Sequence, residues 1–348
     1  MHIKNQIKSF YKLLSSLNLD EVDMEGYTKD YLQYIINQKT YHLEIYAFVL
    51  EKTIAKANLS LENTIMLDFG AGNGLLAFFA KFCGVKKVEV CDIRPEFIHA
   101  IKQLSDKLKI TIDGFILGNE NEVLKNYAAS SEKPNICIGT DVIEHVYSVD
   151  FLLKAMKIVN PNIVIAFSTG SVYDNMIKRN QLYQIMYKDE YKGYDLKGDN
   201  EGGSIYAGKA FLEVRKQLIV QKAPELKQKQ VNDLSIATRG LNKNDIETCV
   251  EQYLINQQLP SPPKNKYNTC NPITACYTEQ MLTQFQYKKL YFQNGFRLTS
   301  YNGFYNIHHL LLKRILLKII NSLPKLFKTS YLGRFVAPFV VLIGKPTT

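Results

Sequence analysis

Short apolar runs alternate with amphipathic stretches between residues 64 and 168. Each run is bounded by turn residues or an acid, a pattern typical of buried parallel strands. The runs cover residues 64–67, 85–92, 110–117, 134–140 and 162–168. Segment 95–108 carries apolar side chains at helical spacing, so we expect a helix there. Strands that alternate with helices predict an α/β fold with a doubly wound, mostly parallel sheet.

The rest of the chain departs from this alternation. Residues 1–60 hold one glycine, Gly26, and two apolar clusters, which predict helices. Residues 171–278 are polar and interrupted by glycine and proline. Beyond residue 171 we expect helices at 208–222, 244–254, 279–293 and within 307–327, and strands at 297–301 and 336–343. Asn244 is a candidate cap for the second of these helices.

The stretch IMLDFGAGNGLLA at 65–77 joins a strand, a glycine turn and the start of a helix. Glycines at 70, 72 and 74 let the backbone turn sharply and let a ligand lie against it. The helix start points unpaired N–H groups toward that ligand. The dinucleotide fingerprint, G-x-G-x-x-G, would need a glycine where Leu75 stands. A dinucleotide site and a tight turn without a ligand remain alternatives for this stretch.

Asp68, two residues before the first glycine, completes a longer motif. Asp68 and the glycines resemble motif I of class I S-adenosylmethionine-dependent methyltransferases, usually written D/E-x-G-x-G-x-G. The run D-V-I-E-H-V at 141–146 is similar to the segment after the fourth strand in the small-molecule and quinone-precursor branch. Stretches 238–247 and 268–280 also recur in bacterial sequences of that branch, without a role that we can assign.

The resemblance implies S-adenosyl-L-methionine as cofactor and a seven-stranded, mostly parallel, Rossmann-like sheet that closes with an antiparallel hairpin. The division of the chain that follows is an N-terminal helical cap (1–60), a cofactor-binding core (61–170), an insertion that forms a substrate lid (171–278) and a C-terminal part of the core (279–348). Tyr41 and His42 either border the cofactor pocket or belong to a helical layer packed on the sheet.

The resemblance also implies roles for single residues. Asp92 ends the second strand, and its two carboxylate oxygens suit the paired hydroxyls of a ribose; the alternative is a solvated strand-end acid. Ile93 would lie beside the adenine, and Asp141 beside the methionine portion. Asn119 replaces a common acid, but its amide oxygen can accept from the adenine amino group. The expected cofactor contacts are Asp68, Phe69, Gly70, Ala71, Gly72, Gly74, Asp92, Ile93, Asn119 and Asp141.

The reaction expected from the resemblance is methyl transfer to a small-molecule, sugar or lipid-linked acceptor, at oxygen. His145 is the candidate general base for a hydroxyl acceptor, with Glu144 beside it. The alternative for His145 is a structural bond to a loop backbone. Tyr173 and Tyr194 are candidate substrate-binding residues of the lid, or ordinary surface or core tyrosines. No residue pattern suggests a metal.

Basic residues are concentrated at the C-terminal end. Residues 280–348 contain ten of the 43 lysines and arginines and none of the 33 acids, so the remainder is balanced. Within this tail, 307–328 combines leucines and isoleucines with a basic stripe, as in helices that lie on membrane surfaces or bind partners. A helix packed on the sheet is the alternative. The pattern therefore predicts peripheral contact with an anionic membrane.

Other function classes fit less well. A nicotinamide-dependent dehydrogenase would need the third glycine at Leu75 and a second nucleotide-binding half. A DNA amino-methyltransferase would carry [DNS]-P-P-[YFW] after the fourth strand, so we expect no DNA partner. An RNA methyltransferase and a noncatalytic scaffold of the same fold remain alternatives.

The six cysteines include no C-x-x-C pair. They predict reduced thiols and a cytoplasmic protein, which could also be membrane-associated through 307–328. The N-terminal stretch lacks the apolar core of a signal peptide, and no apolar run reaches the ~20 residues that span a bilayer.

Overall fold

The computed structural model describes residues 3–24, 26–193, 206–261, 265–308, 311–326 and 332–347. The chain forms two compact units. Unit 1 comprises residues 1–143, 148–175 and 283–348, and unit 2 comprises 144–147 and 176–282. All six cysteines are free thiols.

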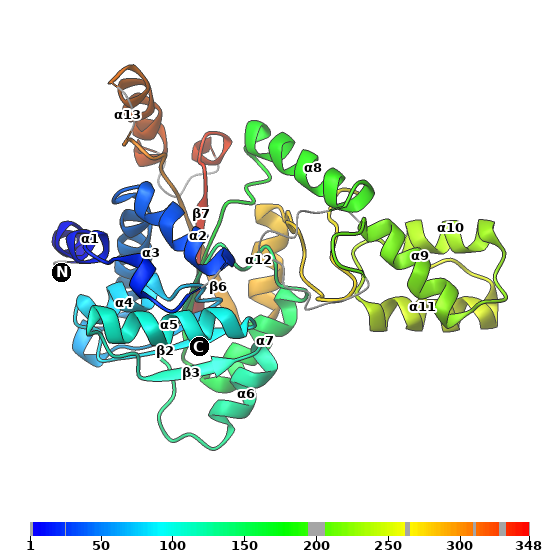
Figure 1. Cartoon of the computed structure of the whole chain (residues 1–348), viewed down its shortest axis with the longest axis horizontal. Coiled ribbons are helices and arrows are strands. Elements are labelled where there is room, and N and C mark those ends of the chain that lie inside the picture. The colour runs from blue at the N-terminus through cyan, green and yellow to red at the C-terminus, as the bar shows by residue number, and fades with distance from the viewer. Residues whose placement is uncertain are drawn as a thin grey trace. The chain divides into compact units, whose positions relative to one another are not determined.

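A seven-stranded sheet forms the centre of unit 1 (Figure 1). Its order is β3-β2-β1-β4-β5-β7-β6. The strands are β1 (Ile65–Phe69), β2 (Lys87–Asp92), β3 (Gly114–Leu117), β4 (Ile136–Thr140), β5 (Val164–Thr169), β6 (Phe296–Asn302) and β7 (Val340–Pro346). The first five are parallel, whereas β7 pairs antiparallel with both β5 and β6. This confirms the predicted doubly wound sheet with its closing hairpin.

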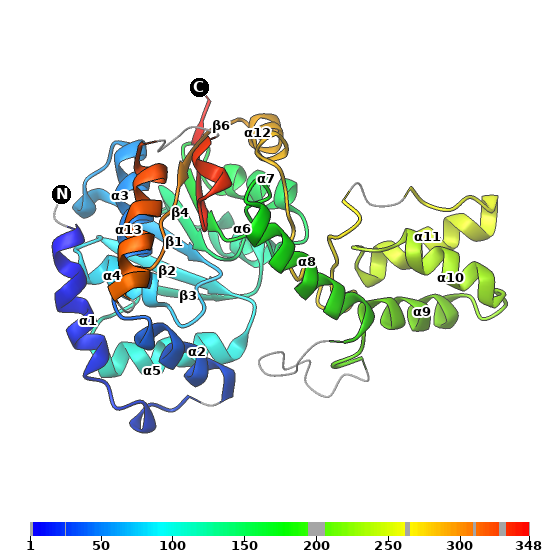
Figure 2. The ribbon, with the colours of Figure 1, turned by 90° about the horizontal axis from the view of Figure 1, so that it is seen from above.

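Helices cover both faces of the sheet (Figure 2). One face carries α1 (Ile7–Ser15), α2 (Gly26–Asn37), α3 (Tyr41–Ala57), α4 (Leu75–Phe82) and α5 (Pro95–Leu108), and the other carries α6 (Glu120–Ala128), α7 (Val149–Val159) and α12 (Gln284–Gln293). Strands β1, β4 and β5 are almost wholly buried because they lie between these layers. Because helices cover both faces, a ligand can reach the sheet only at its edges. In open α/β sheets, ligands bind at the carboxyl ends of the parallel strands.

Several predicted boundaries are wrong, and the largest differences are in unit 1. Helix α12 begins at Gln284 rather than at residue 279, because Thr283 and Gln286 form a reciprocal capping box. Strand β7 begins at Val340 rather than at residue 336, and Pro338, which has no N–H to donate, lies just before it. Strand β3 likewise begins at Gly114 and not at residue 110.

Unit 2 is mainly helical. Its helices are α8 (Met176–Tyr191), α9 (Phe211–Lys222), α10 (Gln228–Ala237) and α11 (Lys243–Asn256). Apolar side chains of α9, α10 and α11 form a separate core. The cap of α11 is Asn242, whose side chain accepts from the Asp245 N–H at 2.9 Å, so the cap predicted at Asn244 is wrong.

A buried ion pair joins α8 to α9 within unit 2. Arg215 donates to the two carboxylate oxygens of Glu190 at 3.1 and 2.6 Å, and both side chains are buried. The Thr269 hydroxyl donates to the same carboxylate at 2.6 Å, and the Ser235 carbonyl accepts from Arg215 Nε. Every charged atom of the pair thus has a partner, which a buried ion pair requires.

Helix α13 (Leu311–Leu326) belongs to unit 1 and stands away from its sheet in Figure 1. The side chain of Asn321 anchors it, accepting from the Tyr305 N–H at 2.7 Å and donating to the Tyr305 carbonyl at 2.9 Å. Among the described residues, none of the helices has the length and apolar character that crossing a bilayer requires.

Candidate functional site

The glycine turn after β1 is bound to the end of β2. The N–H groups of Gly70 and Ala71 both donate to the Cys91 carbonyl, at 2.8 and 3.1 Å. The Gly72 N–H donates to Oδ2 of Asp92 at 2.8 Å. The carboxyl ends of these two neighbouring strands, which carry Asp68 and Asp92, therefore lie close together.

Gly70 and Gly72 are needed for different reasons. Both have positive φ, at +70° and +53°, which favours glycine. A Cβ at Gly70 would lie 2.3 Å from Val142 Cγ2, so packing within the fold excludes a side chain there. A Cβ at Gly72 would meet nothing closer than the Tyr31 ring at 3.6 Å. At Gly72 a Cβ would make only ordinary van der Waals contact with Tyr31, so the positive φ, rather than packing, is what favours glycine there.

The Asp68 carboxylate is buried at the start of α4. It accepts a hydrogen bond from the Ala77 N–H, in the first turn of that helix, while its Oδ2 is buried without a hydrogen-bond partner. Burial raises the pKa of the Asp68 carboxyl to about 8, and the charge of Asp92 adds to the shift. A buried acceptor left unpaired is costly. A cationic donor on a ligand would satisfy it.

The Asp92 carboxylate closes the other side of the turn. Its Oδ1 accepts from the Arg94 N–H at 2.9 Å, and its Oδ2 accepts from Gly72. Burial raises the pKa of Asp92, although these two backbone bonds oppose the shift. Each carboxylate oxygen can accept a further bond, which suits a pair of hydroxyls. The next residue, Ile93, is apolar and 52% exposed, as a residue lying against a flat ring would be.

Asn119 and Phe69 have structural roles of their own. Asn119 caps α6, and its Oδ1 accepts from the Asn121 N–H at 3.0 Å. An amide oxygen can accept two bonds, so the predicted contact with an adenine amino group stays a prediction. Phe69 directly precedes the glycine turn. Its side chain is buried, and its ring contacts that of Phe167 edge to face.

Asp141 follows β4 in a left-handed conformation, with φ of +53°. Its N–H donates to the Ser168 carbonyl at 3.0 Å, which ties it to the end of β5. Burial raises the pKa values of three tyrosines from α2 and α3, namely Tyr31, Tyr41 and Tyr46, and the charge of Asp141 adds to each shift. The N-terminal helices therefore place phenol groups around Asp141.

One further contact connects the N-terminal helices with this end of the sheet, and another set of contacts lies among those helices. Asn73 of the glycine turn donates to the Thr28 carbonyl at 2.9 Å. His42 lies among aromatic rings, including those of Tyr34 and Tyr46, and burial lowers its pKa to about 4. Sequence reasoning named Tyr41 and His42 but missed Tyr31 and Tyr46, whose only signal was an apolar cluster at helical spacing.

Three predicted residues remain, and the structure describes two of them. His145 belongs to unit 2, where its Nδ1 lies 3.0 Å from the Tyr277 carbonyl. Since a carbonyl only accepts, Nδ1 carries a proton in this contact. Tyr173 is half-buried in unit 1, and Tyr194 lies outside the described residues. The roles of all three stay predictions.

No family model and no curated protein matches the chain. Solved structures do match. A Galdieria sulphuraria protein described as a sarcosine dimethylglycine methyltransferase shares 9% identity and a TM-score of 0.43, with 98% of each chain covered. Magnesium protoporphyrin IX methyltransferase from Synechocystis PCC 6803, with bound SAH, shares 11% identity and a TM-score of 0.39, with 99% of this chain and 97% of that chain covered.

A Listeria monocytogenes protein described as an S-adenosylmethionine dependent methyltransferase shares 13% identity and a TM-score of 0.39, over 86% of this chain and 100% of that chain. Likenesses this weak do not place the chain in a family. Its function has to be inferred from the residues of its own site.

Proposed function

We propose that the chain is an S-adenosylmethionine-dependent methyltransferase. The proposal rests on the Oδ2 atom of Asp68, which is buried without a hydrogen-bond partner. It lies beside a glycine turn that is hydrogen-bonded to a second acid, Asp92. A cofactor with an ammonium group at one end and a ribose with two hydroxyls satisfies both carboxylates. A dinucleotide would instead bring a pyrophosphate toward two buried acids, which repels it.

Different residues of unit 1 would bind different parts of the cofactor. Asp68 would accept from the ammonium group and Asp92 from the ribose hydroxyls. Gly72, which has no Cβ, would let the amino acid end approach the backbone. Ile93 would cover one face of the adenine. When bound, S-adenosylmethionine supplies a methyl group activated by its sulfonium charge. The chain then has to exclude water and hold the acceptor in line with that methyl group.

The acceptor that we propose is a small molecule, a sugar or a lipid-linked molecule, methylated at oxygen. A hydroxyl acceptor has to lose a proton, and His145 is our candidate base because imidazole is the side chain suited to proton transfer near neutral pH and its Nδ1 bond to Tyr277 orients the ring. His145→Gln is the test: it should lower the rate constant of methyl transfer and leave cofactor affinity unchanged.

Calorimetric titration tests the proposed cofactor. S-adenosylmethionine and S-adenosylhomocysteine should each bind once per chain, and NADH should not bind. Tritium from labelled S-adenosylmethionine should then appear in metabolites of a cell extract. The absence of S-adenosylmethionine binding would refute the proposal and favour a scaffold, whereas binding of NADH would favour a dehydrogenase. Label that appeared in RNA would favour an RNA methyltransferase.

We also propose that α13 rests on an anionic membrane surface. Its apolar residues Leu312, Ile315, Leu316 and Ile319 follow helical spacing and are 48–84% exposed. They lie on the side of the helix opposite Asn321, which anchors it to Tyr305. Lys318 is exposed on the flank of this apolar face, Arg314 is exposed on the side of Asn321, and the helix contains no acid. An apolar face on a basic helix fits the boundary between acyl chains and anionic headgroups.

Serine substitution of Leu312, Ile315 and Ile319 together should lower binding to vesicles of phosphatidylglycerol and phosphatidylcholine at least tenfold. Burying each such side chain fully is worth roughly 1.5–3 kcal/mol. Vesicle flotation measures the effect. Phe285→Ser with Phe292→Ser, two exposed residues of α12, is the matched control and should bind as the wild type does. Equal binding of the triple variant, or no binding of the wild type, would contradict the proposal.

A further inference from the structure

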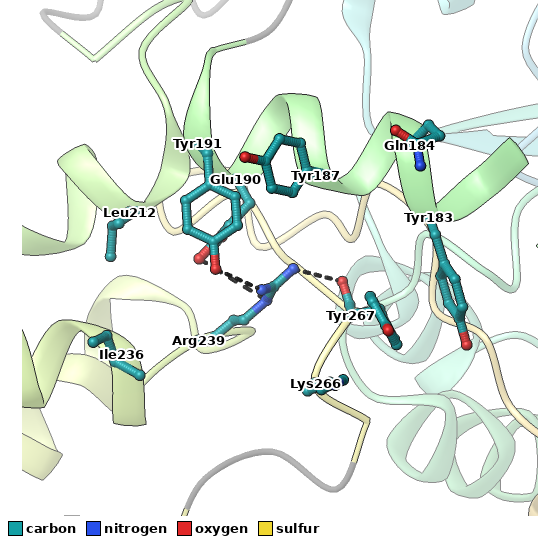
Figure 3. A pocket seen from close by; sticks show the side chains of 10 residues that line it. All are labelled: Tyr183, Gln184, Tyr187, Glu190, Tyr191, Leu212, Ile236, Arg239, Lys266 and Tyr267. Atoms are coloured by element: carbon teal, nitrogen blue, oxygen red, sulfur yellow. Dashed lines mark hydrogen bonds and ion pairs between the residues drawn. The ribbon is translucent and has the colours of Figure 1, made fainter. Parts of the chain in front are cut away.

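Unit 2 contains a cavity of about 630 Å³ between α8 and the segment at Lys266 and Tyr267 (Figure 3). This volume suits a small molecule and not a protein partner. The cavity lies wholly within unit 2, so a ligand can bind there whether or not unit 1 holds a cofactor. Binding in this cavity does not depend on the proposed methyl transfer.

Tyrosines form one side of the cavity. Tyr183, Tyr187 and Tyr191 stand four residues apart on α8, so they share one face of the helix. Tyr183 stacks on Tyr267, with ring centroids 3.8 Å apart, and Tyr187 and Tyr191 are each about half exposed. A wall of this kind offers flat apolar ring faces together with phenol hydroxyls.

Arg239 reaches into the cavity between Tyr191 and Tyr267 (Figure 3). It donates to the Tyr191 hydroxyl at 3.3 Å, to the Tyr267 carbonyl at 2.8 Å and to the Asn268 carbonyl at 3.2 Å. These three acceptors are neutral, and they use three of the five N–H groups of a guanidinium. The side chain is only 12% exposed, so water screens its charge poorly.

One acid serves two arginines at this cavity. Glu190 is the only acid among the described lining residues, and it lies 3.9 Å from Arg239 Nε, within ion-pair distance. Both oxygens of Glu190 also accept from the buried Arg215. Lys266 adds a further positive charge, 5.2 Å from the Tyr267 ring. The lining residues together with Arg215 therefore carry a net positive charge.

The stretches 238–247 and 268–280 meet at this wall. Arg239 belongs to the first, 238–247, and the Asn268 carbonyl that accepts from it belongs to the second, 268–280. The Tyr277 hydroxyl also donates to the Gly240 carbonyl at 3.0 Å. The contacts that join these stretches hold Arg239 in the position where it meets the cavity.

We propose that this cavity binds a sugar that carries a phosphate or carboxylate group. The anionic group would be bound by Arg239 and Lys266, with which it can form charge-assisted hydrogen bonds. The sugar ring would lie on the exposed faces of Tyr187 and Tyr191, whose hydroxyls suit its own. Single-stranded nucleic acid also stacks on tyrosine, but a cavity of this size fits a monosaccharide or disaccharide better.

Saturation-transfer NMR and calorimetry on the full chain test the proposal with glucose 1-phosphate, glucuronate, glucose and oligouridylate. Glucose 1-phosphate, glucuronate or both should bind, and glucose should bind at least tenfold more weakly. The stronger of the two anionic probes shows whether phosphate or carboxylate is preferred. Arg239→Gln and Lys266→Gln should each weaken its binding, the first at least tenfold, and Tyr187→Ala should weaken it several-fold.

Lys243→Gln is the matched control, because Lys243 is an exposed base of unit 2 that does not line the cavity. It should change nothing. Lys266→Gln and Tyr187→Ala remove no backbone contact, so they keep the proposal testable if Arg239→Gln fails to fold. The proposal is overturned if neither anionic sugar binds at millimolar concentration, if glucose binds equally well, if the cavity variants bind as the wild type does, or if oligouridylate displaces the sugars.

Discussion

Asp68→Asn is expected to stabilise the cofactor-free protein at pH 8 and to weaken S-adenosylmethionine binding at least tenfold. An asparagine amide fills the same space, and its oxygen still accepts from the Ala77 N–H. It lacks the negative charge that we assign to the cofactor's ammonium group. Hydrogen bonds to charged groups are worth about 1.5–3 kcal/mol, which corresponds to roughly ten- to a hundredfold in affinity.

The gain in stability depends on pH in a definite direction. In the unfolded chain the Asp68 carboxyl ionises near 3.8, whereas burial raises its pKa in the folded protein to about 8. The native state then holds the extra proton, so its stability is full below pH 4 and falls as the pH rises to about 8. Each unit of pKa difference is worth about 1.4 kcal/mol, so the loss is on the order of a few kcal/mol.

Thermal unfolding and calorimetry measure the two effects separately. The wild-type melting temperature should decline between pH 5 and pH 8 by more than that of Asp68→Asn. Asp106→Asn, at an exposed position of α5, should leave both the decline and the cofactor affinity unchanged. Unaltered affinity in Asp68→Asn would show that Asp68 does not hold the cofactor. A lower melting temperature at pH 8 would show that Asp68 is ionised and paired within the protein.

Glu190→Leu is expected to destabilise unit 2 by about 3–5 kcal/mol, the usual cost of removing one partner from a buried ion pair. The change leaves the guanidinium of Arg215 buried, and among the described residues its one remaining acceptor is the Ser235 carbonyl. A guanidinium stays protonated at any accessible pH. Hydrogen exchange followed by mass spectrometry measures the effect in peptides of α8, α9 and α10, separately from the sheet of unit 1.

Two further variants should destabilise unit 2 less than Glu190→Leu does. Arg215→Met should cost less than Glu190→Leu, because a carboxyl group can take up a proton and the Thr269 hydroxyl still donates to it. The double variant Glu190→Leu with Arg215→Met should also cost less than Glu190→Leu alone, since no unpaired charge is left. A double variant whose cost equals the sum of the two single costs would contradict this account.

The sheet and half of the site could be predicted because their signals are local. Asp68, the glycines and Asp92 each end a strand, and parallel strands bring their carboxyl ends to one edge. The residue that caps α11 was harder to predict. Asn242 and Asn244 have the same side chain, and only the backbone conformation of the folded chain decides which of them becomes the cap. Equal propensities do not decide between neighbouring residues.

Long-range partners could not be predicted in the same way. Tyr31 and Tyr46 lie some hundred residues before Asp141 along the chain, and nothing in their own helices indicates that they approach it. Glu190, Arg215 and Thr269 form one buried cluster from three separate elements. Such pairings depend on how the elements pack, which hydrophobic periodicity does not report.

The Asp92 carboxylate accepts a hydrogen bond from the Gly72 N–H, and we propose that it also binds the ribose. A substitution at residue 92 that altered the proposed ribose contact would also remove the bond to Gly72, so the two properties are coupled. Ile93 is apolar, and half of its surface is exposed. An engineered enlargement for cofactor analogues with substituents on the base should therefore begin at Ile93, where shape can change without loosening the loop.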